Sequence, residues 1–221
     1  MSNGHHHPCH CQNVHPRRRI VLTGGPGAGK TAILELARKY FCRHVHVLPE
    51  SASLLFGGGF PRLPSDPGRM AAQRAIFYVQ RELERSVDDE SEPAITLCDR
   101  GTLDGIAYWP QDAQSFLQAV GTTQAEQIAR YDAVIHLRTP TVGFDHSNPL
   151  RIENAQQAME LDKRIEDAWA GHPRRIFVEA SADFLEKAMQ TLHVLRDELP
   201  PCCGAQMPHF RPMVEPAGAP A

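Results

Sequence analysis

The sequence predicts an α/β fold in which helices cover both faces of a five-stranded parallel sheet. Short apolar runs alternate along the chain with longer segments of helical periodicity, a pattern typical of parallel strands joined by helices. A glycine-rich segment, Gly24–Thr31, separates the first apolar run from the first helical segment. Because ligands bind beyond the carboxyl ends of the strands in such sheets, we expect the functional residues to follow the predicted strands.

The predicted strands are short apolar runs bounded by polar or turn-forming residues. The first contains Ile20, Val21 and Leu22, which indicates a strand buried on both faces. The other four runs have the same character. The five predicted strands are Arg19–Thr23, His44–Leu48, Ala94–Cys98, Ala133–Leu137 and Ile176–Glu179.

Longer segments with apolar residues at helical spacing predict the helices. Two stretches interrupt the pattern. Phe56–Arg62 holds three consecutive glycines and Thr139–Leu150 holds two prolines, so we expect both to be mobile loops. The six predicted helices are Gly29–Phe41, Arg69–Val87, Gln111–Val120, Thr123–Tyr131, Ile152–Ala170 and Asp183–Glu198.

The chain of 221 residues is expected to form one domain, over residues 17–199, between two tails. Residues 1–16 hold five of the twelve histidines together with Cys9 and Cys11. This tract is predicted to be a disordered tail, with binding of a soft or borderline metal as the alternative. Residues 200–221 are rich in proline, lack an apolar period and are predicted to be a second disordered tail.

The composition excludes several classes of protein. A net charge of −3 gives no general attraction to nucleic acid or to anionic membranes. No apolar run reaches the roughly 18 residues of a transmembrane helix. The six cysteines do not form a disulfide framework and the N-terminus lacks a secretory signal, so we expect a cytoplasmic protein. The oligomeric state stays open.

The glycine-rich segment GGPGAGKT fits the pattern G-x-x-x-x-G-K-[ST] without a mismatch. Between a strand and a helix, this pattern predicts the P-loop of a nucleotide-binding NTPase. Glycines let the main chain approach phosphate oxygens, and successive N–H groups form an anion-binding nest. We expect Lys30 to contact the β- and γ-phosphates and the Thr31 hydroxyl to bind Mg²⁺. The predicted nucleotide-binding residues are Gly24, Gly25, Gly27, Ala28, Gly29, Lys30, Thr31, Ala32 and Ser181.

Charged residues follow the next two predicted strands. Asp99 follows Ala94–Cys98 and is expected to hold Mg²⁺ with Thr31, directly or through water. Arg100 comes next and is expected to hold a phosphate on the acceptor side. Glu50 ends the preceding strand and is expected to position an acceptor hydroxyl or to accept its proton. The alternatives are an Asp–Arg pair that closes a turn and an acid that caps a helix.

Arg151 and Arg164 bracket the helical run RIENAQQAMELDKR. We expect this segment to form a lid whose arginines stabilise the charge of a transferring phosphoryl group. The alternative is a solvated helix with i,i+4 ion pairs such as Glu160–Arg164. Ser181 follows the fifth predicted strand, on the rim near the base. The segment after the fourth strand does not match the guanine-binding pattern N-K-x-D, which favours ATP over GTP.

The chain resembles the AAA_28 group of P-loop proteins, which includes the kinase domain of NadR-type ribosylnicotinamide kinases and the TRPL translocation defect protein family. The matching segments are GGPGAGKT, VLPESA, LCDRGTLDGIAYWP and RIENAQQAMELDKRIEDAWAGHPR, spread over most of residues 19–181. The order of motifs is also similar, more distantly, to thymidylate and deoxynucleoside kinases. The resemblance implies a nucleoside/nucleotide-kinase-like sheet, with Glu50, Asp99 and Arg100 facing the acceptor and with Arg151 and Arg164 in a lid.

Three functions follow as hypotheses. The first is a kinase that uses ATP and Mg²⁺ to phosphorylate a small molecule, and the Glu50, Asp99 and Arg100 set favours it. The second is a nucleotide-dependent switch, which the translocation defect resemblance suggests. The third is an ATPase that acts on a partner. No residue set in the sequence defines the acceptor.

Overall fold

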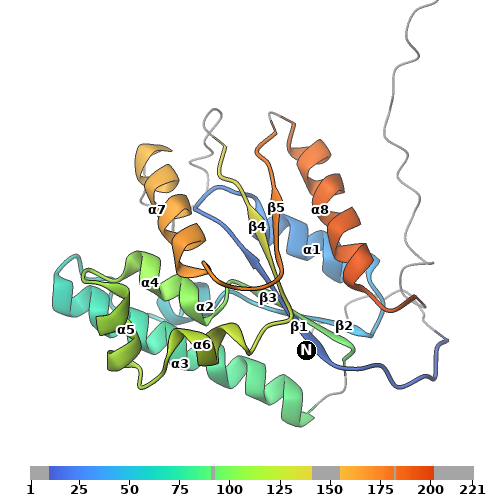
Figure 1. Cartoon of the computed structure of the whole chain (residues 1–221), viewed down its shortest axis with the longest axis horizontal. Coiled ribbons are helices and arrows are strands. Elements are labelled where there is room, and N and C mark those ends of the chain that lie inside the picture. The colour runs from blue at the N-terminus through green and yellow to red at the C-terminus, as the bar shows by residue number, and fades with distance from the viewer. Residues whose placement is uncertain (1–9, 91–92, 141–154, 182, 202–221) are drawn as a thin grey trace, which may run out of the picture.

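The computed structural model describes residues 10–90, 93–140, 155–181 and 183–201 (Figure 1). Within these residues, five parallel strands form one sheet in the order β2-β3-β1-β4-β5, which confirms the predicted fold class. The prediction for β4 is confirmed to the residue, and the other strands differ from prediction by one residue at one or both ends. The strands are β1 (Arg18–Thr23), β2 (Val45–Leu48), β3 (Ile95–Asp99), β4 (Ala133–Leu137) and β5 (Arg175–Val178).

The strand order explains why three predicted motifs lie together. The central strand β1 pairs with β3 and β4, and Leu22 of β1 lies opposite Asp99 of β3. Strand β2 lies on the other side of β3. Because all strands are parallel, the glycine-rich loop after β1, Glu50 after β2 and Arg100 after β3 emerge at the same edge of the sheet.

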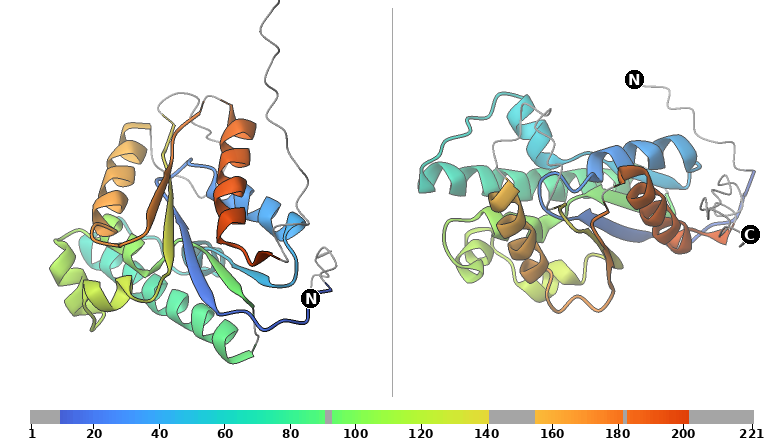
Figure 2. Two further views of the ribbon diagram at one scale, coloured as in Figure 1. Left: turned by 45° about the vertical axis from the view of Figure 1, so that its right-hand side comes forward. Right: turned by 90° about the horizontal axis from the view of Figure 1, so that it is seen from above.

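Helices cover both faces of the sheet (Figure 2). Ile20 and Leu22 of β1 face the apolar cluster that contains Ile33 and Leu192, on the side of α1 and α8. Val21 points to the opposite face. The helices are α1 (Lys30–Tyr40), α2 (Ser51–Gly57), α3 (Asp66–Glu90), α4 (Gly105–Tyr108), α5 (Ala113–Ala119), α6 (Gln124–Ile128), α7 (Ala155–Ala168) and α8 (Phe184–Glu198), with a short 3₁₀ turn, η1 (Thr102–Asp104), before α4.

Two sequence predictions about helices are wrong. The loop predicted over Phe56–Arg62 begins inside α2, a helix that the prediction missed because its apolar run is short and ends in glycines. Helix α3 begins at Asp66, three residues before the predicted start. Pro67 and Gly68 lie in its first turn, where proline is tolerated.

The remaining helix predictions are close to the structure. Asp112 and Thr123 accept hydrogen bonds from the main chain as N-caps of α5 and α6, so these helices begin just after them. Both helices end earlier than predicted, as does α7, while α8 ends at the predicted residue. The start predicted for α7 at Ile152, most of the Thr139–Leu150 loop and most of both tails lie outside the described residues.

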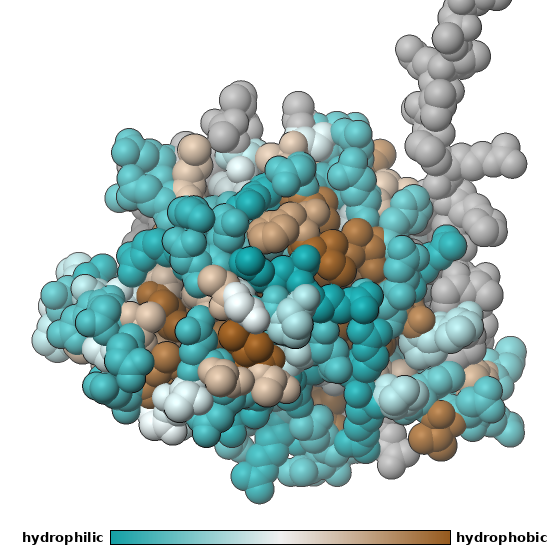
Figure 3. Space-filling view, viewed as in Figure 1, coloured by the Kyte–Doolittle hydropathy of each residue, from teal (hydrophilic) through white to brown (hydrophobic). Residues whose placement is uncertain are grey.

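The face of the molecule in Figure 3 is mostly hydrophilic, and apolar side chains reach it in small, separate areas. None of the described helices combines the length and the apolar character needed to cross a membrane. The two tryptophans, Trp109 and Trp169, are fully buried in the cluster on the α7 side of the sheet.

Candidate functional site

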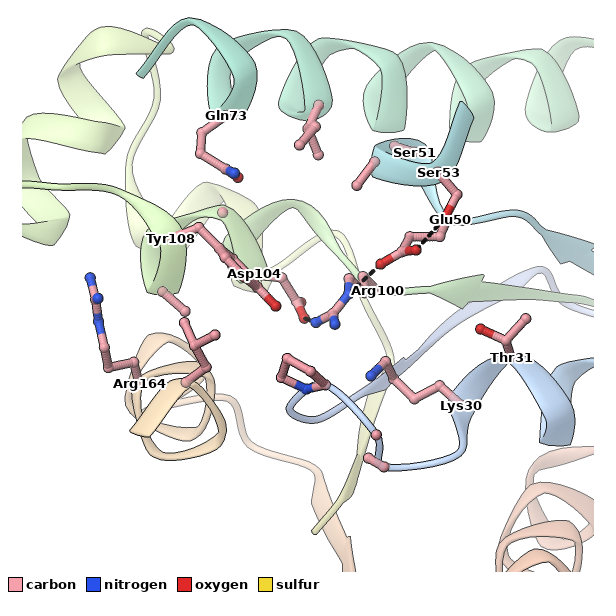
Figure 4. A pocket seen from close by; sticks show the side chains of 18 of the residues that line it. Lys30, Thr31, Glu50, Ser51, Ser53, Gln73, Arg100, Asp104, Tyr108 and Arg164 are labelled. Carbon is pink, nitrogen blue, oxygen red and sulfur yellow. Dashed lines mark hydrogen bonds and ion pairs between the residues drawn. The ribbon is translucent and has the colours of Figure 1, made fainter. Parts of the chain in front are cut away.

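A cavity with a volume of about 1140 Å³ lies beyond the carboxyl ends of β1, β2 and β3. The glycine-rich loop and the start of α1 form one wall, and α2, α3 and α4 form another (Figure 4). Helices α7 and α8 also contribute residues. Sites for one small molecule typically measure about 300–1,000 Å³. The volume of this cavity is slightly above that range.

The backbone of the glycine-rich loop requires glycine at both ends. Gly24 has a φ of 132°, and a Cβ added there would lie 2.1 Å from the carbonyl oxygen of Leu137. Gly29 has a φ of 91° and precedes the first turn of α1. Gly24 and Gly25 do not line the cavity. The predicted nucleotide-binding residues that line it are Gly27, Ala28, Gly29, Lys30, Thr31, Ala32 and Ser181. The first turn of α1 thus opens on the cavity, where its main-chain N–H groups can bind an anion.

The Lys30 side chain lies buried along this loop. Its Nζ donates hydrogen bonds to the carbonyl oxygens of Gly24, at 2.8 Å, and Gly25, at 2.9 Å. Burial and the nearby positive charge of Arg100 lower the pKa of Lys30. Two cations are thus held together beside the loop, and an anion bound there would stabilise the charged form of both.

Thr31 and Asp99 lie side by side, as a shared metal site requires. The Thr31 hydroxyl donates to Oδ2 of Asp99 at 3.3 Å. The other carboxylate oxygen, Oδ1, is buried and has no hydrogen-bond partner among the described residues. Burial and the negative charge of Glu50 raise the pKa of Asp99. A buried carboxylate oxygen without a partner, next to a hydroxyl, fits a hard cation such as Mg²⁺.

Arg100 and Glu50 form an ion pair in the cavity wall (Figure 4). Nε of Arg100 donates to Oε1 of Glu50 at 2.7 Å, and its NH1 donates to the carbonyl oxygen of Gly24 at 3.2 Å. Arg100 has a φ of 71°, a left-handed conformation that is rare outside glycine. Both side chains line the cavity. The guanidinium therefore links the P-loop to the acid after β2.

Glu50 occupies the N-cap position of α2 without capping it. Its side chain accepts no hydrogen bond from the main chain of that helix and instead bonds Arg100 and the Ser53 hydroxyl. Burial favours the neutral carboxyl, but the charge of Arg100 and the Ser53 hydroxyl outweigh this effect and lower the pKa of Glu50. The carboxylate is therefore charged at neutral pH and faces the cavity.

The amino-acid sequence matches the model of one known protein family. Residues 19–187 match the model of the AAA_28 family, described as an AAA domain. The chain belongs to the AAA_28 family. The match and the loop geometry together identify this AAA_28 chain as a P-loop NTPase-type domain. A comparison with curated proteins finds no match.

The AAA_28 chain also has the fold of a known nucleoside kinase structure. It is similar to the structure of deoxyadenosine kinase from M. mycoides with bound dATP, with a TM-score of 0.58. The sequences are 17% identical, and the match covers 81% of this chain and 99% of the kinase chain. At this level of identity, the similarity concerns the fold.

Asp104, which we did not predict as a site residue, organises the segment after β3. Its Oδ1 accepts hydrogen bonds from the Thr23 hydroxyl and, at 3.2 Å, from Arg100. Its Oδ2 accepts from the main-chain N–H of Gly101 at 3.1 Å and from Nε1 of Trp169 at 3.0 Å. The DRGTLDG and W-x-x-H-P-R motifs of this AAA_28 chain therefore meet at one buried carboxylate, which holds Arg100 in place.

The P-loop is also fixed by a hydrogen bond to a carboxylate of α7, that of Asp162. Oδ1 of Asp162 accepts a hydrogen bond from the main-chain N–H of Gly25 at 2.7 Å and from the Thr139 hydroxyl at 3.2 Å. Nε2 of His136 lies 3.1 Å from the same oxygen. Burial opposes the charge, but the His136, Gly25 and Thr139 contacts outweigh it and lower the pKa of Asp162. One carboxylate thus connects the loop, β4 and α7.

Replacing Asp162 by alanine is expected to lower the free energy of unfolding by about 1–3 kcal/mol, because buried donors lose their acceptor. Nucleotide affinity should fall as well, since the freed loop must be ordered on binding. Denaturant unfolding and nucleotide titration measure the two effects. Asp167→Ala, an exposed acid on the same helix, is the matched control and should change the free energy of unfolding by less than about 0.5 kcal/mol. Equal effects of the two substitutions would contradict the role of Asp162.

Of the two predicted lid arginines, the structure describes Arg164 alone. Arg164 lines the cavity on its far side from Lys30 in Figure 4, and its NH2 donates to the carbonyl oxygen of Trp109 at 2.9 Å. Arg151 lies outside the described residues. Ser181 also lines the cavity, and its hydroxyl donates to Glu186.

Several cavity residues were missed by the sequence reasoning. Gln73 and Phe77 line the cavity from α3, and their i,i+4 spacing was a usable signal, since such residues share one face of a helix. Lys187 and Phe184, from the first turns of α8, line the part of the cavity next to the P-loop. Nζ of Lys187 donates to the carbonyl oxygen of Ala28 at 2.9 Å, and burial lowers its pKa to about 8.

Proposed function

We propose that this AAA_28 domain transfers the terminal phosphoryl group of ATP to a hydroxyl group of a small molecule. The observation that carries the proposal is the Arg100–Glu50 ion pair, which faces the cavity beside Lys30. A nucleotide switch does not need a second acid on the acceptor side of the phosphates. A kinase needs a group that contacts the acceptor hydroxyl.

In the proposed complex, the nucleotide lies along the first turn of α1. Main-chain N–H groups there and the Lys30 ammonium bind the β- and γ-phosphates. Thr31 and Asp99 would hold Mg²⁺, which supplies positive charge against the phosphate oxygens when it is bound. The half-exposed ring of Phe184, beside Gly29, offers a surface for the base. The absence of an N-K-x-D pattern after β4 supports ATP as the donor.

The acceptor hydroxyl is placed between Glu50 and the γ-phosphate. The Glu50 carboxylate accepts a hydrogen bond from the hydroxyl and orients its oxygen in line with the phosphorus atom. As the new O–P bond forms and the bond to the leaving ADP oxygen breaks, the hydroxyl proton passes to Glu50. Arg100, which touches both Glu50 and the P-loop, stabilises negative charge on the transferring group.

The cavity wall beyond Glu50 indicates the class of acceptor. Phe77 and Tyr108 offer aromatic surfaces, and the Arg100 guanidinium lies 5.7 Å from the centre of the Tyr108 ring. Gln73 points into the same region with an amide that can donate and accept hydrogen bonds (Figure 4). A planar ring with a polar edge, joined to a hydroxyl-bearing group, matches these features. We therefore propose a nucleoside or a similar compound as the acceptor.

We also propose that Arg164 and Arg151 act as lid residues that contact the phosphate groups. Arg164 would exchange its hydrogen bond with the Trp109 carbonyl for a phosphate oxygen when the cavity is filled. Ser181, at the rim near α8, would contact the nucleotide.

The proposal is tested by measuring ADP formation from ATP and Mg²⁺ against a library of nucleosides and sugars, with ³¹P NMR to identify the phosphorylated product. We expect ADP formation to depend on one class of acceptor. Steady ATP hydrolysis that no compound in the library accelerates, without any phosphorylated product, would favour the ATPase or switch hypothesis instead.

Replacing Asp99 by asparagine is expected to abolish the Mg²⁺ dependence of turnover while nucleotide binding without metal persists. The amide keeps the shape but loses the charge that holds the cation. Since the folded protein raises the pKa of Asp99, its ionised form destabilises the fold at neutral pH. The variant should therefore unfold at the same or a higher denaturant concentration than the wild type in the absence of Mg²⁺. The control is Asp197→Asn, because Asp197 is an exposed acid on α8; this variant should keep the Mg²⁺ dependence of the wild type. Unchanged Mg²⁺ dependence in Asp99→Asn would contradict the assignment of Asp99 to the metal site.

A further inference from the structure

Sulfur and imidazole ligands gather at a second place, at the turn that precedes β2. The side chains of Cys11, His15 and His44 approach one another so that one ligand atom from each lies within 4.8 Å of the others. Sγ of Cys11 lies 3.4 Å from Nε2 of His15. The cluster joins two segments about 30 residues apart, the N-terminal segment and the turn after α1.

The spacing suits a tetrahedral ion. Zn²⁺ binds thiolate at about 2.3 Å and imidazole at about 2.0–2.1 Å, so a sulfur and a nitrogen on the same tetrahedral ion lie about 3.5 Å apart. The Cys11–His15 distance is close to this value. His44 is buried, and one of its ring nitrogens lies within 4.8 Å of the ligand atoms of Cys11 and His15, so it is the third ligand of the set.

The protein holds these ligands through other contacts. Arg43 donates a hydrogen bond to the carbonyl oxygen of Cys11 at 2.9 Å, and so fixes the N-terminal segment to the turn independently of the ligand atoms. The main-chain N–H of Asn13 lies 3.4 Å from Sγ of Cys11 and donates to it, as suits a thiolate. Sγ of buried Cys42 lies 3.4 Å from Nδ1 of His44. This contact orients the imidazole, as partners of metal-bound histidines do.

We propose that Cys11, His15 and His44 bind a borderline-soft divalent cation such as Zn²⁺, with Cys42 holding the His44 ring. On binding, Cys11 releases its thiol proton to solvent and both imidazoles bind in the neutral form. The site differs in chemistry from the Thr31–Asp99 pair, whose oxygen ligands suit Mg²⁺. Its role is structural, because the ion would fasten the N-terminal segment to the turn between α1 and β2.

The test uses the full chain, freed of metal with a chelator and titrated with Zn²⁺ and with Co²⁺ as a spectroscopic probe. We expect the wild type to show the thiolate-to-cobalt absorption band and the intense visible bands of a tetrahedral site. Cys11→Ser should lose the thiolate band. His15→Gln and His44→Gln should each weaken Zn²⁺ binding at least about tenfold, since even outer partners of metal ligands contribute about 10- to 100-fold. At the same concentration, Zn²⁺ should raise the unfolding temperature of the wild type more than that of these three variants.

The neighbouring residues Cys9 and His10 give the matched controls. Cys9→Ser and His10→Gln each remove one cysteine or histidine from the tail, as Cys11→Ser and His15→Gln do, but leave the three proposed ligands intact, and we expect wild-type affinity from both. His44 is buried, so circular dichroism of His44→Gln without metal checks its fold, and the half-buried His15 gives an independent variant. Wild-type affinity in both His15→Gln and His44→Gln, or an equal loss in the Cys9 and Cys11 variants, would overturn the proposal.

Discussion

Replacing Lys30 by alanine is expected to lower nucleotide turnover by at least about 10²–10³-fold, the loss typical of removing one preorganised charge-stabilising group. In the free protein, the ammonium contacts the carbonyls of Gly24 and Gly25 inside the loop. When phosphate is bound, it is the cation placed to stabilise the transferring group. The fold should persist, because the lost hydrogen bonds contribute only about 1 kcal/mol each. Turnover measured by ADP release, together with circular dichroism, tests both parts.

The matched control is Lys39→Ala. Lys39 lies on the same helix but is exposed, so turnover should stay at the wild-type value. Wild-type turnover and nucleotide affinity in Lys30→Ala would remove the assignment of this loop as the catalytic phosphate site.

Replacing Glu50 by glutamine is expected to lower phosphorylation of the acceptor by about 10²–10⁴-fold with little change in ATP affinity. The amide preserves the size of the side chain but removes the negative charge that orients the acceptor hydroxyl and pairs with Arg100. Initial rates at saturating ATP, combined with a separate measurement of ATP binding, distinguish the two effects. The result separates a kinase from a nucleotide switch, because a switch does not use this carboxylate on an acceptor.

Glu160→Gln is the control for this experiment. Glu160 lines the same cavity from α7 but is exposed and pairs with no cation among the described residues. It should leave the rate unchanged. If Glu50→Gln and Glu160→Gln behave alike, Glu50 has no role at the acceptor and the kinase proposal loses its main support.

Much of this site could be predicted from local sequence patterns. The P-loop is a continuous motif, and its strand and helix are recognisable on either side. Glu50 and Arg100 could be placed on one rim because each follows a parallel strand, and the strand order puts β2 beside β3. Their ion pair could not be predicted, because it joins residues 50 positions apart, and no pattern in the sequence signals the left-handed backbone at Arg100.

The missed features depend on long-range packing. Asp162 contacts Gly25 from 137 positions away, and its side chain was indistinguishable from the other acids of a charged helix. Asp104 was part of a motif that we quoted, but its role depends on Trp169, 65 positions later. Helix α2 was missed for the opposite reason, because the glycines after it dominated the local pattern.

The left-handed backbone at Arg100 is a strained position whose cost is offset by the ion pairs of its own side chain. A residue with a Cβ costs about 1–2 kcal/mol in that conformation, whereas glycine adopts it freely. Glycine in place of Arg100 would relieve the backbone but would remove the guanidinium that joins Glu50 to the P-loop. The substitution would also leave the Glu50 carboxylate and the buried Asp104 carboxylate without their cation, and removing one partner of a buried ion pair typically costs about 3–5 kcal/mol, more than the relief of the backbone. Libraries aimed at a more heat-resistant protein should keep this arginine fixed and seek stability in the exposed faces of α3 and α8.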